Sequence, residues 1–309
     1  MLSGARIWAV LKDTVREWID DNAARVAASL AFYTLLSLAP LVILTIAIAG
    51  VVMGEDTARD RIIYEVGQLV GPEGAKTVNA VVASAHQSND GVLSTVIGLI
   101  VLFVGASGVF GELQYAMNTI WGVKPKQSSG LLLLVRERVF SFAMVIAVAF
   151  LLLVSLVVSA VLSGIGRFMA GSLPGGDTVW QVVNVVLSIG IITALFGLIF
   201  KVVPDVEVRW RDVWVGALAT AILFTVGKQL LGIYLGESSV ASAYGAAGSI
   251  VALVVWVYYS SQLVFFGAEF TQVYARANGR TITPSKHAEF VDAADRSPAR
   301  ALHAEAGQS

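Results

Sequence analysis

The sequence predicts an all-α protein, a polytopic membrane helical bundle with six transmembrane helices, an N-terminal interfacial helix and an outer amphipathic helical hairpin. Of its 309 residues 56% are hydrophobic and 14% are charged, whereas about 25% of residues are charged in a soluble domain. The stretch from Val26 to Gly54 carries no charge over 29 residues, and about 20 helical residues suffice to cross a bilayer core. Five further apolar runs of spanning length follow it.

Three regions follow from this pattern. Residues 1–25 are the predicted interfacial helix, residues 26–275 the six-span membrane domain, and residues 276–309 a polar, Ala-rich tail that we expect to be disordered. The spans lie near residues 27–53, 91–111, 139–165, 178–201, 213–236 and 245–271.

The N-terminal region is too charged along its length to be a cleaved signal peptide. Its apolar residues Trp8, Leu11, Val15 and Trp18 recur at helical spacing. We therefore expect an amphipathic helix in the membrane interface, with both tryptophan rings at headgroup depth.

Residues 55–90 form a polar interval with two patterned apolar runs. The runs are separated by Gly71, Pro72, Glu73 and Gly74, which are strong turn formers. This interval is expected to be a hinged pair of short helices that either caps the bundle or lies flat on lipid.

Basic residues set the predicted orientation. Sixteen Lys and Arg residues flank the spans on the side of the two termini, and four lie on the other side. The positive-inside rule places both termini in the cytoplasm and the 55–90 hairpin outside. In a bacterial cell the hairpin then faces the periplasm.

Pro40 lies near the middle of the first predicted span, where its ring removes one backbone donor. Tyr33 and Ser37 lie within two turns of it. Either Ser37 covers the freed carbonyl and the kink is structural, or the kink opens a polar gap used by a substrate.

Lys228 is the single charge within the fifth span. A lysine in the middle of a membrane helix is costly, so its position calls for a reason. It either extends to the headgroups, or faces the bundle interior beside Gln229 and attracts an anionic group, with Asn184 of the fourth span as a neighbour.

Glu112 follows the second span, Glu269 lies near the end of the sixth, and Gln262 lies near its middle. These carboxylates either form helix-end ion pairs with Arg138, Arg209 or Arg276, or Glu269 acts in a proton relay. Glycines spaced three or four residues apart in the second, fifth and sixth spans favour close helix packing.

No catalytic or metal-binding pattern is present in the sequence. The chain has no cysteine, and its three histidines lack zinc-ligand spacing. It also has no GxSxG, Walker-type or HExxH motif. We expect no enzymatic activity, no metal and no cofactor, and the net charge of −1 argues against nucleic-acid binding.

Four stretches together resemble one known family. They are AASLAFYTLLSLAPL at 27–41, FGELQYAMNTIWGV at 110–123, the run at 200–235 and the run at 243–275. The chain resembles the YihY/BrkB family of bacterial inner-membrane proteins, which implies six spans in the inner membrane. The family label ribonuclease BN finds no support in this sequence, and the label virulence factor names a phenotype. Some relatives are suspected of moving lipids or lipopolysaccharide precursors.

The leading functional expectation is a transporter or flippase-like protein for a lipid-like or amphipathic anionic solute of the cell envelope. One alternative is a non-transporting membrane scaffold for envelope assembly. Another is a gradient-driven transporter of a small solute or ion, using Glu269 or Glu112. The expected partners are membrane lipids, an envelope-assembly protein or further copies of the chain.

Overall fold

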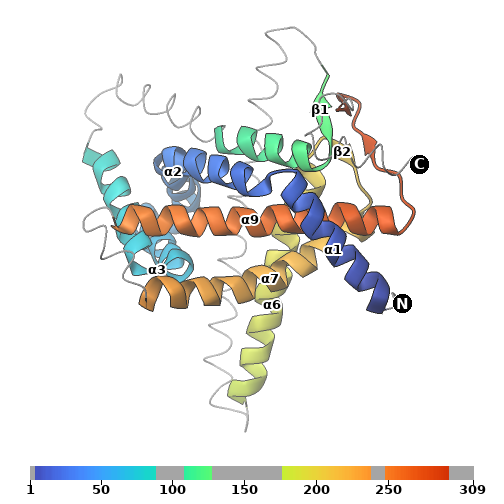
Figure 1. The fold of residues 1–309 in the computed structure, drawn as a ribbon. Coiled ribbons are helices and arrows are strands. Elements are labelled where there is room, and N and C mark those ends of the chain that lie inside the picture. Colours follow the sequence, from blue (N-terminus) through green and yellow to red (C-terminus); the bar gives the residue numbers. More distant parts are fainter. Residues whose placement is uncertain (1–3, 88–107, 127–175, 238–247, 292–309) are drawn as a thin grey trace.

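The structure, a computed structural model, describes residues 4–87, 108–126, 176–237 and 248–291 (Figure 1). Its helices are α1 (Gly4–Asp20), α2 (Ala23–Met53), α3 (Glu55–Gln87), an unlabelled helix at 108–120, α6 (Gly176–Val202), α7 (Trp210–Glu237) and α9 (Gly248–Ala277). Short strands are β1 (Val123–Pro125), β2 (Val206–Glu207), β3 (Thr283–Pro284) and β4 (Ala288–Phe290).

Helix α9 is the centre of the described bundle. It contacts α1, α2, α3 and α7, while α6 packs against α7 (Figure 1). Its end is set by local sequence, because Gly279 adopts a positive φ of 70°. The amides of Gly279 and Arg280 then bond back to the carbonyls of Arg276 and Ala275, the geometry of a Schellman motif.

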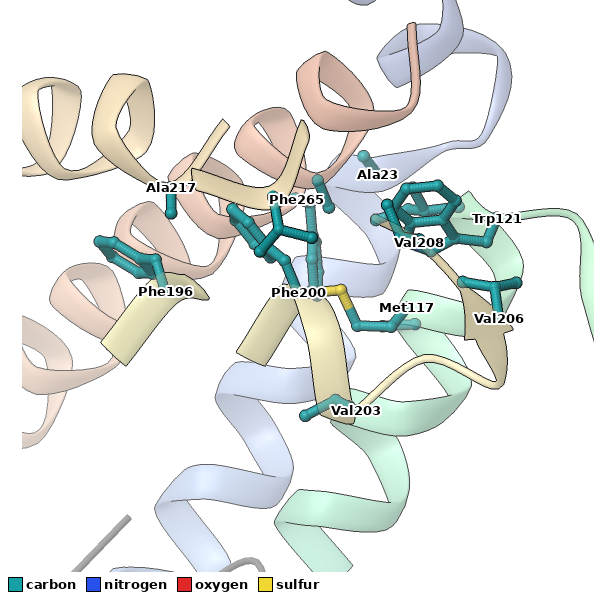
Figure 2. Packing of buried hydrophobic residues seen from close by; sticks show 14 of the residues in the cluster. Ala23, Met117, Trp121, Phe196, Phe200, Val203, Val206, Val208, Ala217 and Phe265 are labelled. Carbon is teal, nitrogen blue, oxygen red and sulfur yellow. The ribbon is translucent and has the colours of Figure 1, made fainter. Parts of the chain in front are cut away.

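The hydrophobic core gathers side chains that are distant in sequence. Ala23 of α2, Met117 and Trp121, Phe200 of α6 and Phe265 of α9 are buried together (Figure 2). Valines 203, 206 and 208, from the connection between α6 and α7, close the same cluster. The core therefore lies at the end of the bundle that carries the short strands.

Helices α7 and α9 cross with almost no space between them. Gly216 lies against Thr271, and Gly267 lies against Thr220. Each threonine hydroxyl donates to the carbonyl of the glycine four residues before it in its own helix, at 2.7 Å. Small residues at a crossing let two helix backbones approach closely, so these two pairs fix an antiparallel register.

Three described helices are long and apolar enough to cross a membrane, at Val185–Val202, Trp210–Leu231 and Ile250–Ala277. They overlap the fourth, fifth and sixth predicted spans. The first predicted span lies in α2, whose stretch Ala23–Leu38 is a shorter apolar helix. Most of the second predicted span and all of the third lie outside the described residues, so the count of six stays a prediction.

Helix α3 differs from the two short helices expected at 55–90, because helical structure continues from Glu55 to Gln87. Arg59 nevertheless donates a 3.0 Å hydrogen bond to Asn79. A straight helix would separate these residues by about 30 Å, so α3 bends back on itself. The contacts favour the expected reversal, while its position outside the membrane stays a prediction.

Both parts of the bent helix meet α2. Val78 and Val82 are buried against Val42 and Ile46, with Ile62 and Val66 at the edge of the cluster. Of the two arrangements expected for the 55–90 interval, this packing favours a cap on the bundle.

The beginning of the tail is ordered, so the expectation of disorder from residue 276 onward is wrong up to Val291. Strand β3 pairs antiparallel with β2, and β4 pairs antiparallel with β1. The physical reason is that the connections at 123–126 and 206–207 offer backbone groups that the tail satisfies. Residues 292–309 lie outside the described part of the chain.

The two tryptophans of α1 have different surroundings. Trp8 is exposed, whereas Trp18 packs against the core cluster. The depth of both rings stays a prediction, but the rings have different surroundings because the end of α1 turns toward the bundle.

Substituting Gly216→Ala tests the helix crossing. The new Cβ would lie 1.8 Å from the Thr271 hydroxyl oxygen, and overpacking costs about 1–3 kcal/mol. The melting temperature in detergent should fall. Gly190→Ala in α6, where a Cβ meets nothing within 4 Å, is the matched control. Equal melting temperatures for the two variants would contradict the close crossing.

Candidate functional site

A polar seam joins α2 to the helix at 108–120. Ser29 donates a 2.5 Å hydrogen bond to the Glu112 carboxylate. About one and two turns further along α2, Tyr33 and Ser37 lie against Gly108, which has no side chain to separate the helices. Three residues chosen from the sequence, Tyr33, Ser37 and Glu112, thus lie along one interface. The side chain of Pro40 lies outside the described set.

The contacts of Glu112 and Arg276 can be compared with the ion pairs expected from the sequence. The Glu112 carboxylate accepts a hydrogen bond from the hydroxyl of Ser29, and Arg276, one of the arginines expected to form a helix-end ion pair, binds Glu17 of α1 at 2.9 Å. Glu112 therefore serves as an acceptor inside a helix pair, while the arginine ties α9 to α1.

A second group of polar side chains lies on α9. Glu269 is 0% exposed and Gln272 is buried, while Gln262 is half-buried. Residues three, four and seven apart share one side of a helix, so these three side chains lie along one side of α9. Burying a carboxylate is costly unless its surroundings compensate it, and a fully buried glutamate in a candidate membrane span is therefore a functional candidate.

Lys228 lies on the inward side of α7. It is half-buried and shares a helix face with Ala221, Phe224 and Leu231, of which Ala221 belongs to the core cluster and Phe224 packs against it. Phe224 also lies edge-on to Trp256 of α9 at 6.4 Å. Gln229, one residue later, is exposed. The structure thus separates two neighbours that the sequence had placed in one candidate cavity.

The predicted site residues do not form one cluster within the described part of the chain. Tyr33, Ser37 and Glu112 lie along α2, and Lys228 lies on α7, with α9 contacting both helices. The side chain of Asn184 lies outside the described residues. Within the described ranges, no group of three His, Asp or Glu side chains could hold a metal ion.

Asp205 is a polar centre that the sequence did not identify. Its carboxylate accepts hydrogen bonds from Gln114 at 3.1 Å and from Asn118 at 2.8 Å. Its amide donates to the Asn118 side chain at 2.8 Å, and its carbonyl accepts from the amide of Ser285. One residue therefore joins the helix at 108–120, the α6–α7 connection and the tail.

A buried ion pair completes this end of the bundle. Asp212, in the first turn of α7, is 2% exposed and lies 3.0 Å from Arg280, just after α9. The sequence signal for Asp205 and Asp212 was weak, since both look like ordinary loop and helix-start carboxylates. Only the fold brings Asn118 and Arg280 to them.

Comparison with known proteins gives a consistent picture. The family model described as Virulence factor BrkB matches residues 14–291. The chain is 30% identical to a UPF0761 membrane protein of Alteromonas mediterranea, over 82% of this chain and 83% of that protein. It is 29% identical to a UPF0761 membrane protein of Rhodospirillum centenum and 26% identical to one of Neisseria meningitidis.

These relatives differ in length. The alignment covers 85% of this chain but 56% of the Rhodospirillum protein, and 87% of this chain but 64% of the Neisseria protein. The chain thus spans less than two thirds of the length of those two relatives. No solved structure matches it significantly.

Replacing Asp205 by alanine tests its role as a junction. Hydrogen bonds to a charged acceptor are worth about 1.5–3 kcal/mol each, and the change removes two of them. The connection between α6 and α7 then loses its side-chain bonds to the helix at 108–120. The tail bonds to the backbone of this connection and should loosen with it, so trypsin should cleave faster after Lys286. Glu207→Ala, two residues later, where the side chain is exposed, is the control. Equal cleavage rates in the two variants would show that the Asp205 carboxylate does not stabilise the connection and the tail.

Proposed function

Because this chain belongs to the BrkB family of membrane proteins, we propose that it is a transporter or flippase-like protein for a lipid-like, anionic solute of the bacterial cell envelope. Its membrane character rests on the family and on the apolar helices. The transport function rests on where charged side chains lie inside those helices.

The proposed topology has six spans, both termini in the cytoplasm, and the α3 hairpin on the outer face of the inner membrane. One contact supports an even number of crossings. Arg6 of α1 reaches the carbonyl of Ala277 at the end of α9, so the first and last described helices meet at the same end of the bundle. The excess of basic residues at that end favours the cytoplasm.

Lys228 carries the transport proposal. The candidate span Trp210–Leu231 contains it, and the side chain lies on the face that α7 turns toward its neighbours. No hydrogen bond or ion pair to Lys228 is found among the described residues. A half-buried ammonium within a span attracts a negatively charged group that enters the bundle, and a phosphate of a lipid headgroup fits this chemistry.

The geometry also narrows the class of substrate. Phe224 and Leu231 share the helix face of Lys228, and Phe224 lies edge-on to Trp256 of α9. A solute with one anionic group and an apolar body matches one cation in apolar surroundings better than a small polar metabolite does.

Reconstituted vesicles test this proposal with Lys228→Ala. Dithionite bleaching should report translocation of fluorescent phosphatidylglycerol about tenfold slower than in the unchanged protein, the effect of losing about 1.4 kcal/mol of attraction in the rate-limiting step. Translocation of a zwitterionic analogue should change less.

Two further variants sharpen that experiment. Lys228→Arg keeps the charge and should retain most activity, and Gln229→Ala alters a side chain at the same depth on the exposed side. Equal rates for Lys228→Ala and Gln229→Ala in folded protein would remove Lys228 from the mechanism. Pro40→Ala, measured in the same vesicles, tests whether a kink in α2 takes part.

The burial of Glu269 favours a second candidate function, a gradient-driven transporter of a small solute or ion. A carboxylate with no solvent exposure in a candidate span can carry a proton across a region that water does not reach. The lipid and proton mechanisms differ in the residue on which transport depends.

Glu269→Gln distinguishes these mechanisms, because the amide has a similar shape and cannot release a proton. If protons drive transport, solute-dependent acidification of pyranine-loaded vesicles should disappear in this variant and persist in Glu207→Gln. Unchanged acidification in folded Glu269→Gln protein would assign the residue a structural role.

A further inference from the structure

Helix α1 has three sides with different surroundings. Successive residues lie about 100° apart on a helix of 3.6 residues per turn. Val10 is 4% exposed and Thr14 is 0% exposed, and Trp18 continues the same side into the core cluster. About a third of the helix circumference therefore packs on the bundle.

A second side of α1 is apolar but uncovered. Its large hydrophobic residues are 36–71% exposed and follow one another at helical spacing: Ile7, Trp8, Leu11, Val15 and Ile19. We call these five residues the α1 ridge. The apolar sector of α1 is thus about twice as wide as the part of it that packs on the bundle. An exposed apolar strip of this length requires a partner.

Charge is distributed unevenly on the remaining side. Helical register places Lys12 and Arg16 next to the ridge, beside Trp8 and Ile19. Asp13 and Asp20 lie further round, toward the edge that meets the bundle. The partner of the ridge is therefore flanked by cations, while the acidic residues face away from it.

The position of α1 along the bundle indicates what kind of partner the α1 ridge contacts. Arg6 bonds to the carbonyl of Ala277, and Glu17 pairs with Arg276, so α1 is fixed where the candidate span Ile250–Ala277 ends. Exposed Trp210 begins the antiparallel span Trp210–Leu231 at this same end, near the Asp212–Arg280 pair. In Figure 1, α1 crosses α9 at a marked angle there.

We propose that the α1 ridge inserts into the lipid leaflet at this end of the bundle, with anionic phospholipid as its preferred partner. Span ends mark the headgroup level, where tryptophan is favoured. An amphipathic helix at that level buries its apolar side in the acyl boundary and places its basic residues among anionic headgroups. The leaflet thereby holds the end of α9 through α1.

The absence of cysteine from these 309 residues allows a direct test in the whole chain. A nitroxide label at Val15→Cys on the ridge is compared with one at Asp13→Cys on the acidic side, in nanodiscs that contain phosphatidylglycerol. The ratio of collisions with oxygen to collisions with a water-soluble nickel chelate should be several-fold higher at position 15. Equal ratios would overturn the proposal.

Two further measurements distinguish lipid from other partners of the α1 ridge and test which class of lipid it prefers. Dipolar broadening between labels at position 15 would assign the ridge to a second copy of the chain and overturn the proposal. Exchanging phosphatidylglycerol for phosphatidylcholine, or substituting Lys12→Glu, should lower the ratio at position 15. A ratio unaffected by both changes would overturn the preference for anionic lipid.

Discussion

The reciprocal contact of two glycines with two threonines at the crossing of α7 and α9 is the constraint on which the other described contacts depend. It joins Gly216 to Thr271 and Gly267 to Thr220, and so sets which residues of the two helices lie at the same level. That register brings Asp212 beside Arg280 and places the start of α7 beside the end of α9. Because α1, α2 and α3 also pack on α9, their positions follow from the same helix.

Polar groups within the bundle fall into two kinds. The hydroxyls of Thr220, Ser261 and Thr271 donate to carbonyls four residues earlier in their own helices, which satisfies them without any neighbour. Lys228 and Glu269 differ, because burying a charged side chain in apolar surroundings is costly unless another group compensates it. Their stability depends on what other elements or solutes bring to them, which is why both functional proposals rest on these residues.

The tail connects several segments at the end of the bundle that carries the short strands. Asp205 contacts Asn118 and Ser285, and the two strand pairs connect residues 123–126 and 206–207 to residues 283–290. The same end holds α1, whose attachment through Glu17 and Arg276 adds the N-terminal segment. Described segments distant in sequence thus meet at the end of the bundle where the candidate span in α7 begins and the one in α9 ends.

The sequence by itself determined the membrane class, the helices and several of their ends. Uninterrupted apolar runs and the period of α1 are local properties, so no knowledge of neighbours was needed. Only the tertiary structure decided that Trp18 turns inward while Trp8 stays exposed, that Lys228 and Gln229 face different surroundings, and that Asp205 joins three segments. The tail was assigned to disorder because its partners, the connections at 123–126 and 206–207, are distant in sequence. Hydrophobicity and turn propensity act within a few residues, whereas the burial of one side of a helix and the partner of one carboxylate depend on which elements pack together.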